Sequence, residues 1–141
     1  MSSPHESADL ILKLYELRRE DTMRKARDWF TAFNPDSLDD IRTAVQGEHS
    51  AYYRMVTSYW DMAASLVNNG GIDEKMFTDA NGEHMAVFAK VEPFVAEIRQ
   101  HWNMPQYLVQ LEQLILRQPN AKERLAQLRE RLRAMTARRS S

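Results

Sequence analysis

The sequence predicts an all-α protein folded as an irregular helical bundle. Glycine and proline are scarce, with four and five residues among 141, and no run of alternating β-branched residues indicates a strand. Residues 49–69 place apolar side chains over one continuous half of a helical circumference, whereas an ordinary surface helix has an apolar arc of about 100° or a little more. We therefore expect 49–69 to form a central buried helix that contacts two or more neighbours.

The length suits a single domain, because domains most often contain about 100–150 residues. We expect residues 1–141 to form one helical domain with a core over about 7–118. A basic C-terminal helix over 120–138 is expected either to dock on this core or to swap onto another copy of the chain.

The N-terminal region is expected to form one long helix or a bent one. Ser7 is a suitable N-cap for its start. The apolar face of residues 10–17 is rotated from that of residues 23–33, and the charged patch 18–21 separates the two. The helix therefore either meets different neighbours along its length or bends at this patch. It should stop by Asn34, because the residue before a proline avoids the helical conformation.

Capping and stop signals place the next elements. Asp36 or Ser37 is expected to cap a short helix over 38–46. The central helix should end at the Asn-Asn-Gly-Gly sequence of residues 68–71, whose members tolerate positive φ. An aspartate then caps one or two helical turns over 74–79.

A second long helix is expected over about 83–102. Its apolar face continues in phase across Pro93, which removes one backbone hydrogen bond and predicts a kink. We favour one Pro-kinked helix over two helices that meet at Glu92, because the apolar phase is unbroken. Pro105 suits the first position of the helix that follows.

The last helix should run from Ala121 to about Ala137, with Asn120 as its cap. Its apolar residues recur at spacings of 3, 4 and 3, which is a coiled-coil-like pattern over about two heptads. This narrow seam and two flanking cations form a candidate interaction surface: Arg124, Leu125, Leu128, Arg131, Leu132 and Met135.

Charge is spread unevenly along the chain. Residues 1–120 contain 12 basic and 18 acidic residues, whereas residues 121–141 contain seven basic and two acidic ones. A cationic helix can bind a phosphate backbone. The cations surround most of this helix, however, and no aromatic residue lies among them for base stacking. We favour docking of the basic helix on the acidic core, within or between chains, over nucleic-acid binding.

The residues that carry most enzyme chemistry are absent or scattered. The chain has no cysteine, which excludes disulfides, thiolate zinc sites and cysteine nucleophiles. Neither the H-E-x-x-H zinc signature nor the Glu-x-x-His pattern of di-iron bundles occurs. Glu97 and His101 are interpreted as a surface pair, and His84 as a satisfied, partly buried residue or a helix-boundary residue. We expect no catalytic residue, no metal ligand and no cofactor.

One polar feature has two interpretations. Arg54, Ser58, Asp61 and Ser65 form a stripe along the central helix. If that helix is buried on all sides, the charged members need partners and could line a polar cavity. If one side faces water, the stripe is a solvated face, which is the interpretation that we favour.

The order of features over residues 50–117 resembles a widespread group of uncharacterised bacterial helical domains. The segment SYWDMAASLVNNGGIDEKMF is followed by a proline-containing helix that ends VEPFVAEIRQHW, with a late arginine, Arg99. The resemblance implies a helical fold without a known activity, so no functional residue is inferred from it. Many such proteins are membrane-anchored, whereas no stretch here approaches the roughly 20 apolar residues of a membrane span.

These observations favour a non-enzymatic protein-interaction or scaffold protein that associates with itself. Nucleic-acid association through the basic C-terminal helix is the alternative. A small-molecule-binding or enzymatic bundle around Arg54 and Asp61 is the least favoured hypothesis. The N-terminal sequence lacks the basic and apolar regions of a secretion signal, so we expect a cytoplasmic location.

Overall fold

The computed structural model describes residues 2–140, and this part of the chain is helical without any β-strand. The all-α prediction is therefore confirmed. The elements are α1 (Pro4–Arg18), α2 (Asp21–Ala32), α3 (Leu38–Gln46), α4 (Ser50–Asn68), α5 (Glu74–Ala80), α6 (Glu83–Val91), a 3₁₀ turn η1 (Glu92–Phe94), α7 (Val95–His101), α8 (Val109–Leu116) and α9 (Ala121–Ser140).

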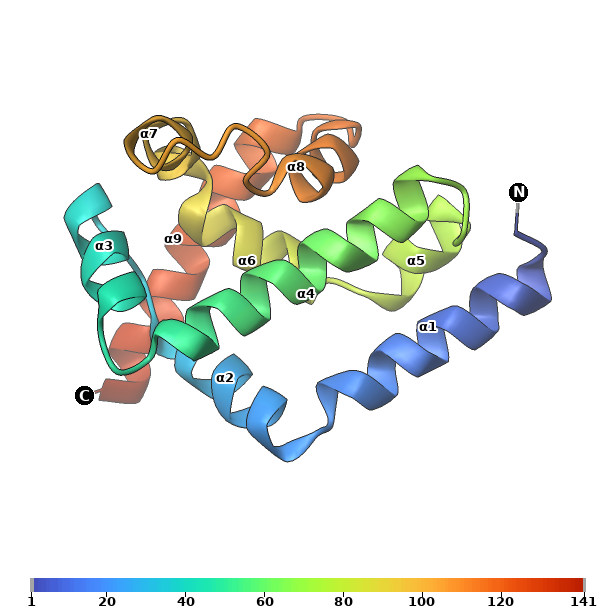
Figure 1. Ribbon diagram of the computed structural model, residues 1–141, viewed down its shortest axis with the longest axis horizontal. Coiled ribbons are helices and arrows are strands. Elements are labelled where there is room, and N and C mark those ends of the chain that lie inside the picture. Colours follow the sequence, from blue (N-terminus) through green and yellow to red (C-terminus); the bar gives the residue numbers. More distant parts are fainter. Residues whose placement is uncertain (1, 141) are drawn as a thin grey trace.

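Helix α4 is the central element, as predicted. It packs against α2, α3 and α8, and Figure 1 shows it crossing the middle of the molecule. Its core-facing residues are Tyr53, Val56, Thr57, Trp60, Ala63, Ala64 and Val67. The helix ends where Gly70 adopts a positive φ of 84°, a conformation that glycine allows without a Cβ penalty.

The predicted N-cap of the first helix is wrong by four residues, since Ser3 and not Ser7 is the cap. Helix α1 begins at Pro4, because Ser3 and Glu6 form a capping box in which each side chain accepts the backbone N–H of the other. Ser7 instead lies inside the helix and is buried, and its hydroxyl oxygen accepts the N–H of Asp73 at 2.9 Å. It therefore ties α1 to the start of α5.

Of the two alternatives for the N-terminal region, the structure has the bend at the charged patch, as a break between α1 and α2. The carboxylate of Glu20 accepts the N–H groups of Thr22 and Met23, at 3.1 and 3.0 Å, and so caps the new helix. Because the axis turns there, the two rotated apolar faces both reach the core: Leu14 from α1 and Met23 from α2 are buried.

The kink at Pro93 is also confirmed, and it is sharper than a gentle bend. The chain stays helical but tightens into the 3₁₀ turn η1, because the proline has no N–H for the α-helical ladder. Figure 1 shows α7 almost end-on while α6 crosses the view, so the two helices run in different directions. The turn therefore carries α7 across to lie near α3 and α4.

The predicted helix start at Pro105 is wrong, because α8 begins only at Val109. Asn103 and Leu108 have left-handed φ values of 53° and 52°, which interrupt any helix between them. Residues 102–108 consequently form an irregular segment between α7 and α8.

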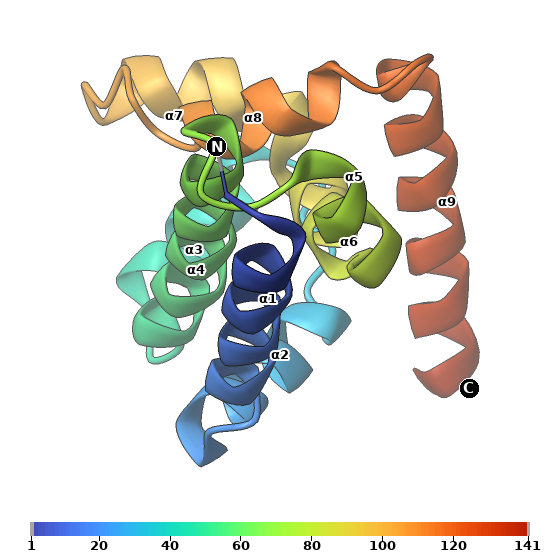
Figure 2. The same cartoon turned by 90° about the vertical axis from the view of Figure 1, so that its right-hand side faces the viewer.

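Helix α9 docks on its own chain, beside α6 (Figure 2). Leu125 is fully buried, and Leu128 packs against the core. Arg129 donates to the carbonyl oxygen of Ala89, and Arg133 donates to that of Pro35 at 2.7 Å. These contacts place the basic helix against the core of the same chain.

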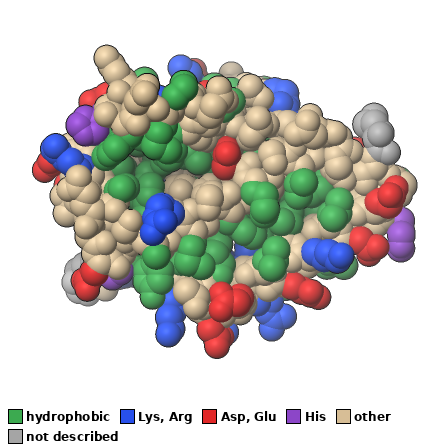
Figure 3. All heavy atoms as spheres, viewed as in Figure 1, with side chains coloured by type: hydrophobic (Ala, Val, Ile, Leu, Met, Phe, Trp, Pro, Cys, Tyr) green, Lys and Arg blue, Asp and Glu red, His purple; other side chains and the backbone are tan. Residues whose placement is uncertain are grey.

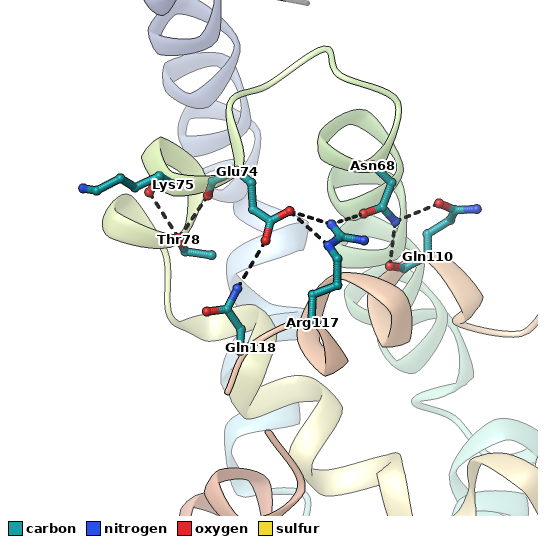
Figure 4. A network of polar contacts seen from close by, with 7 residues as sticks. All are labelled: Asn68, Glu74, Lys75, Thr78, Gln110, Arg117 and Gln118. Atoms are coloured by element: carbon teal, nitrogen blue, oxygen red, sulfur yellow. Dashed lines mark hydrogen bonds and ion pairs between the residues drawn. The ribbon is translucent and has the colours of Figure 1, made fainter. Parts of the chain in front are cut away.

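A polar network ties the ends of three helices together (Figure 4). Glu74 at the start of α5 accepts from Arg117 at 2.7 Å and from Gln118 at 3.3 Å. Arg117 also donates to Asn68 at 2.6 Å, and Asn68 donates to Gln110 of α8. Asn68, the last residue of α4, and Arg117 therefore help to fix α5 and α8 against the C-terminal end of α4.

Candidate functional site

An open cavity of about 620 Å³ lies between α3, α4, α7 and the segment 102–108. Figure 3 shows hydrophobic side chains gathered around a hollow over α3, α4 and α7. The residues that line the cavity are Ile41, Val45, Tyr53, Arg54, Thr57, Ser58, Asp61, Ile98, Trp102, Met104, Pro105, Gln106, Tyr107 and Leu108.

The cavity has one polar wall and an apolar remainder. Helix α4 supplies the polar wall, because Arg54, Ser58 and Asp61 follow one another at helical spacings of four and three residues. Helices α3 and α7 and the irregular segment supply apolar side chains, including Ile98 and Trp102. The cavity is therefore amphipathic across its width.

Three of the four residues of the predicted polar stripe line this cavity. Arg54 and Ser58 are exposed, and Asp61 is half-buried. Ser65 is not among the lining residues, and its hydroxyl donates to the carbonyl oxygen of Met62 at 2.6 Å. The stripe therefore lines an open cavity over part of its length. This result combines features of the polar cavity and the solvated face, the two interpretations of the sequence.

Asp61 caps a helix that is distant in sequence. Its Oδ1 accepts the backbone N–H of Leu111 at 2.9 Å, in the first turn of α8. Leu108, which precedes α8, has left-handed dihedral angles and provides no side-chain cap of its own. Burial raises the pKa of Asp61, while the N–H groups of Leu111 and Gln110 and the charge of Arg99 act in the opposite direction. Asp61 therefore has a structural partner.

Removal of this cap should destabilise the fold. We expect Asp61→Ala to lower the free energy of unfolding by about 1–2 kcal/mol, because the first turn of α8 loses its acceptor. Asp61→Asn keeps a side-chain oxygen and should recover part of the loss. Urea unfolding followed by circular dichroism measures both variants, and an alanine variant as stable as the wild type would contradict the capping role.

Arg54 has no such partner. Among residues 2–140, no side chain or carbonyl group forms a hydrogen bond or ion pair with its guanidinium group. It is also the one basic residue among those that line the cavity. An arginine in this position presents five N–H donors to a ligand that enters the cavity.

Two tyrosines from different elements meet at the cavity. The hydroxyl groups of Tyr53 on α4 and Tyr107 on the irregular segment are hydrogen-bonded to each other. Burial raises the pKa of Tyr53 to about 12 and that of Tyr107 well above its ordinary value of 10.0, so both phenols are neutral near pH 7. One hydrogen bond uses one of the two hydroxyl protons, which leaves one O–H donor for a further acceptor.

No pattern in the sequence predicts this tyrosine pair or the segment that completes the cavity. In the sequence, Tyr53 is one member of the apolar arc of 49–69. The segment is held by Arg99, which donates to the carbonyl oxygen of Tyr107 at 2.9 Å and to Glu112 at 3.1 Å. Helical periodicity in the sequence does not reveal this site, because the irregular segment 102–108 has no periodic pattern of apolar residues.

The chain matches a family model described as a domain of unknown function, DUF4760, over residues 4–118. It belongs to this family. The match confirms the predicted resemblance to an uncharacterised domain and covers α1 to α8, so α9 lies beyond the matched region of this DUF4760 protein. No curated protein and no solved structure matches the chain.

No helix between residues 2 and 140 combines the length and the apolar character that a membrane crossing requires. Within the same residues, no group of three or more histidine, aspartate or glutamate side chains is placed to hold a metal ion. Glu97 and His101 both lie exposed on α7.

Two buried polar side chains of the DUF4760 protein belong to its core. His84 packs between the rings of Trp60 and Phe77, and its Nδ1 atom has no hydrogen-bond partner among the described residues. It is therefore more deeply buried than the partly buried, satisfied histidine that the sequence suggested. Lys90 donates to the carbonyl oxygens of Phe30 and Thr31, at 2.7 and 2.8 Å, at the C-terminal end of α2.

The candidate surface on α9 is largely turned toward the chain itself. Leu125 is buried, whereas Leu128 and Leu132 are partly buried. Arg124, Arg131 and Met135 are exposed. The apolar seam predicted from the sequence is therefore real, but the core of the same chain covers most of it.

Proposed function

We propose that this DUF4760 protein is a non-enzymatic interaction protein that associates with a second copy of itself through α4. The observation that carries the proposal is a stripe of partly exposed apolar residues on that helix. The members of this α4 stripe are Tyr52, Met55, Tyr59, Met62 and Leu66.

The α4 stripe has the spacing of a helix–helix interface. Successive members are 3, 4, 3 and 4 residues apart, which is the repeat that lets two helices interlock along a seam. Within the stripe, Met62 is 43% exposed, although most of the other apolar residues of α4 are buried. The wide apolar arc therefore divides into a core face and this outer stripe, on which Met62 is the most exposed member.

Small residues beside the stripe favour close approach of a partner helix. Ala51, Ser58 and Ser65 are seven residues apart and form a column along its edge. None carries a charge or a long side chain that would hold a second helix away. The stripe also has nearly the same spacing when reversed about Tyr59, so two copies can pair antiparallel in a symmetric, isologous contact.

The structure changes which helix is the better candidate for self-association. The seam of α9 is mostly covered by its own chain, and its cations Arg129 and Arg133 are paired with Glu92 and Asp36 of that chain. Basic residues of α9 therefore form ion pairs with acidic residues of the core within one molecule. On the α4 stripe, the Tyr59 hydroxyl donates to the carbonyl oxygen of Leu14 in α1, whereas Met62 is exposed.

A charge placed on the stripe tests the proposal. We expect Met62→Glu to raise the dimer dissociation constant at least about tenfold, because each copy would place an unpaired carboxylate in an apolar contact. Light scattering over a concentration series measures the change. Met135→Glu on α9 is the matched control, since Met135 is 41% exposed and Met62 is 43% exposed.

Either of two results would remove the proposal. One is a wild-type protein that remains monomeric at every concentration, and the other is dissociation by Met135→Glu with no effect of Met62→Glu. Nucleic-acid association through α9 is the alternative function, favoured by the exposed Arg124 and Arg131. It requires binding to duplex or single-stranded DNA that weakens steeply with salt.

A further inference from the structure

The cavity beside α4 has the size and lining of a small-molecule site. Its volume of about 620 Å³ lies within the roughly 300–1,000 Å³ typical of ligand pockets. Ile98, Trp102 and Leu108 give it apolar walls, and these side chains come from segments fixed by the core and by Arg99. An apolar body of a ligand would be removed from water between them.

The polar side of the cavity favours an anion over a cation. Asp61 is the one acidic residue among the lining residues, and its carboxylate already accepts the N–H of Leu111. The guanidinium group of Arg54 has no partner among residues 2–140. Of the two charged side chains on the α4 wall, Arg54 therefore remains available to a ligand as a cationic donor.

The tyrosine pair adds a second donor. Tyr53 and Tyr107 share one hydrogen bond, so one of their hydroxyl protons stays available to an acceptor inside the cavity. A carboxylate offers two oxygens that accept from a guanidinium group and from a phenol. Phosphate esters and sugars fit less well, because the opposite walls are apolar and offer few polar groups.

We propose that this cavity binds a small monocarboxylate with an apolar body, with Arg54 as the counter-ion. The apolar body would lie against Ile98 and Trp102, and the carboxylate would point toward α4. The proposal is independent of self-association, since the α4 stripe and the cavity lie on different sides of the helix.

The test uses three probes that share one alkyl chain and differ in the head group: decanoate, decanol and decyltrimethylammonium. Isothermal titration calorimetry below the micelle concentration measures affinity, and the NMR signal of the Trp102 indole N–H reports the place of binding. We expect decanoate to bind most tightly. Arg54→Gln should weaken decanoate binding about tenfold, because one charge-assisted contact is lost, and should leave decanol binding unchanged.

Arg24→Gln is the control variant, because Arg24 is an exposed arginine of α2 that does not line the cavity. Tyr107→Phe should weaken decanoate binding by a smaller factor than Arg54→Gln. The proposal is overturned if wild-type protein binds none of the probes or does not prefer decanoate to decanol. It is equally overturned if Arg24→Gln weakens binding as much as Arg54→Gln, or if the shifted indole belongs to Trp29 or Trp60.

Discussion

Replacement of Leu125 by alanine is expected to lower the free energy of unfolding by about 3 kcal/mol, within the roughly 2–5 kcal/mol range for buried Leu→Ala substitutions. Leu125 is 0% exposed and lies on α9, which packs against α6 and α8 of the same chain. The substitution leaves a cavity at the one fully buried leucine of the α9 seam. Urea or thermal unfolding of the purified variant measures the loss.

The control for this prediction is the same substitution at an exposed leucine. Leu12 is 61% exposed, so Leu12→Ala should change the free energy of unfolding by no more than about 0.5 kcal/mol. If α9 docks within its own chain, the midpoint of the Leu125→Ala transition should shift without any new dependence on protein concentration. Equal stability of the Leu125 variant and the wild type would show that α9 contributes little to the fold.

Acidification from pH 6.5 to pH 4 is expected to destabilise the protein through His84 by about 3 kcal/mol. Burial lowers the pKa of His84 from 6.5 to about 4, and each pKa unit corresponds to about 1.4 kcal/mol. Between these two values the unfolded chain binds a proton that the folded chain does not, so stability falls as pH falls. Above pH 6.5 both states are neutral and this contribution to stability is fully present.

The His84→Met variant isolates this effect, because methionine fills a similar apolar space without a titrating group. The difference in unfolding free energy between wild type and His84→Met should change by about 3 kcal/mol over the interval from pH 6.5 to pH 4. His101→Met is the control, since His101 is exposed on α7. A difference that stays constant with pH would mean that His84 accepts a proton in the folded state as easily as in the unfolded one.

The two proposals give separate roles to different sides of α4. Its core face is buried against α2 and α8, its outer stripe is the surface that we propose for a partner copy, and its polar wall lines the cavity. Ser58 lies at the border between stripe and cavity, so ligand binding and self-association can be compared in the same variants. A protein in which Arg54→Gln alters ligand binding but not the oligomeric state would support the independence of the two.

Local signals in the sequence determined most of the helices. Ser37, Asp73 and Gly70 begin or end elements where the sequence placed them, because caps and left-handed glycines act within one helical turn. The 3.6-residue period identified α4 and the seam of α9, since burial of one helix face needs only that period. Pro93 likewise fixed the place of the kink through its missing N–H.

Only the tertiary structure decided which groups meet. Asp61 caps a helix through a residue 50 positions away, and Leu108 takes a left-handed conformation that no local signal announced. The same holds for the pairing of Tyr53 with Tyr107, for the guanidinium of Arg54, which has no partner among residues 2–140, and for the docking of α9 on its own chain. The physical reason is sequence separation. Helix caps and apolar periodicity depend on residues within a few positions of each other, whereas the partner of a polar group depends on how helices distant in sequence pack.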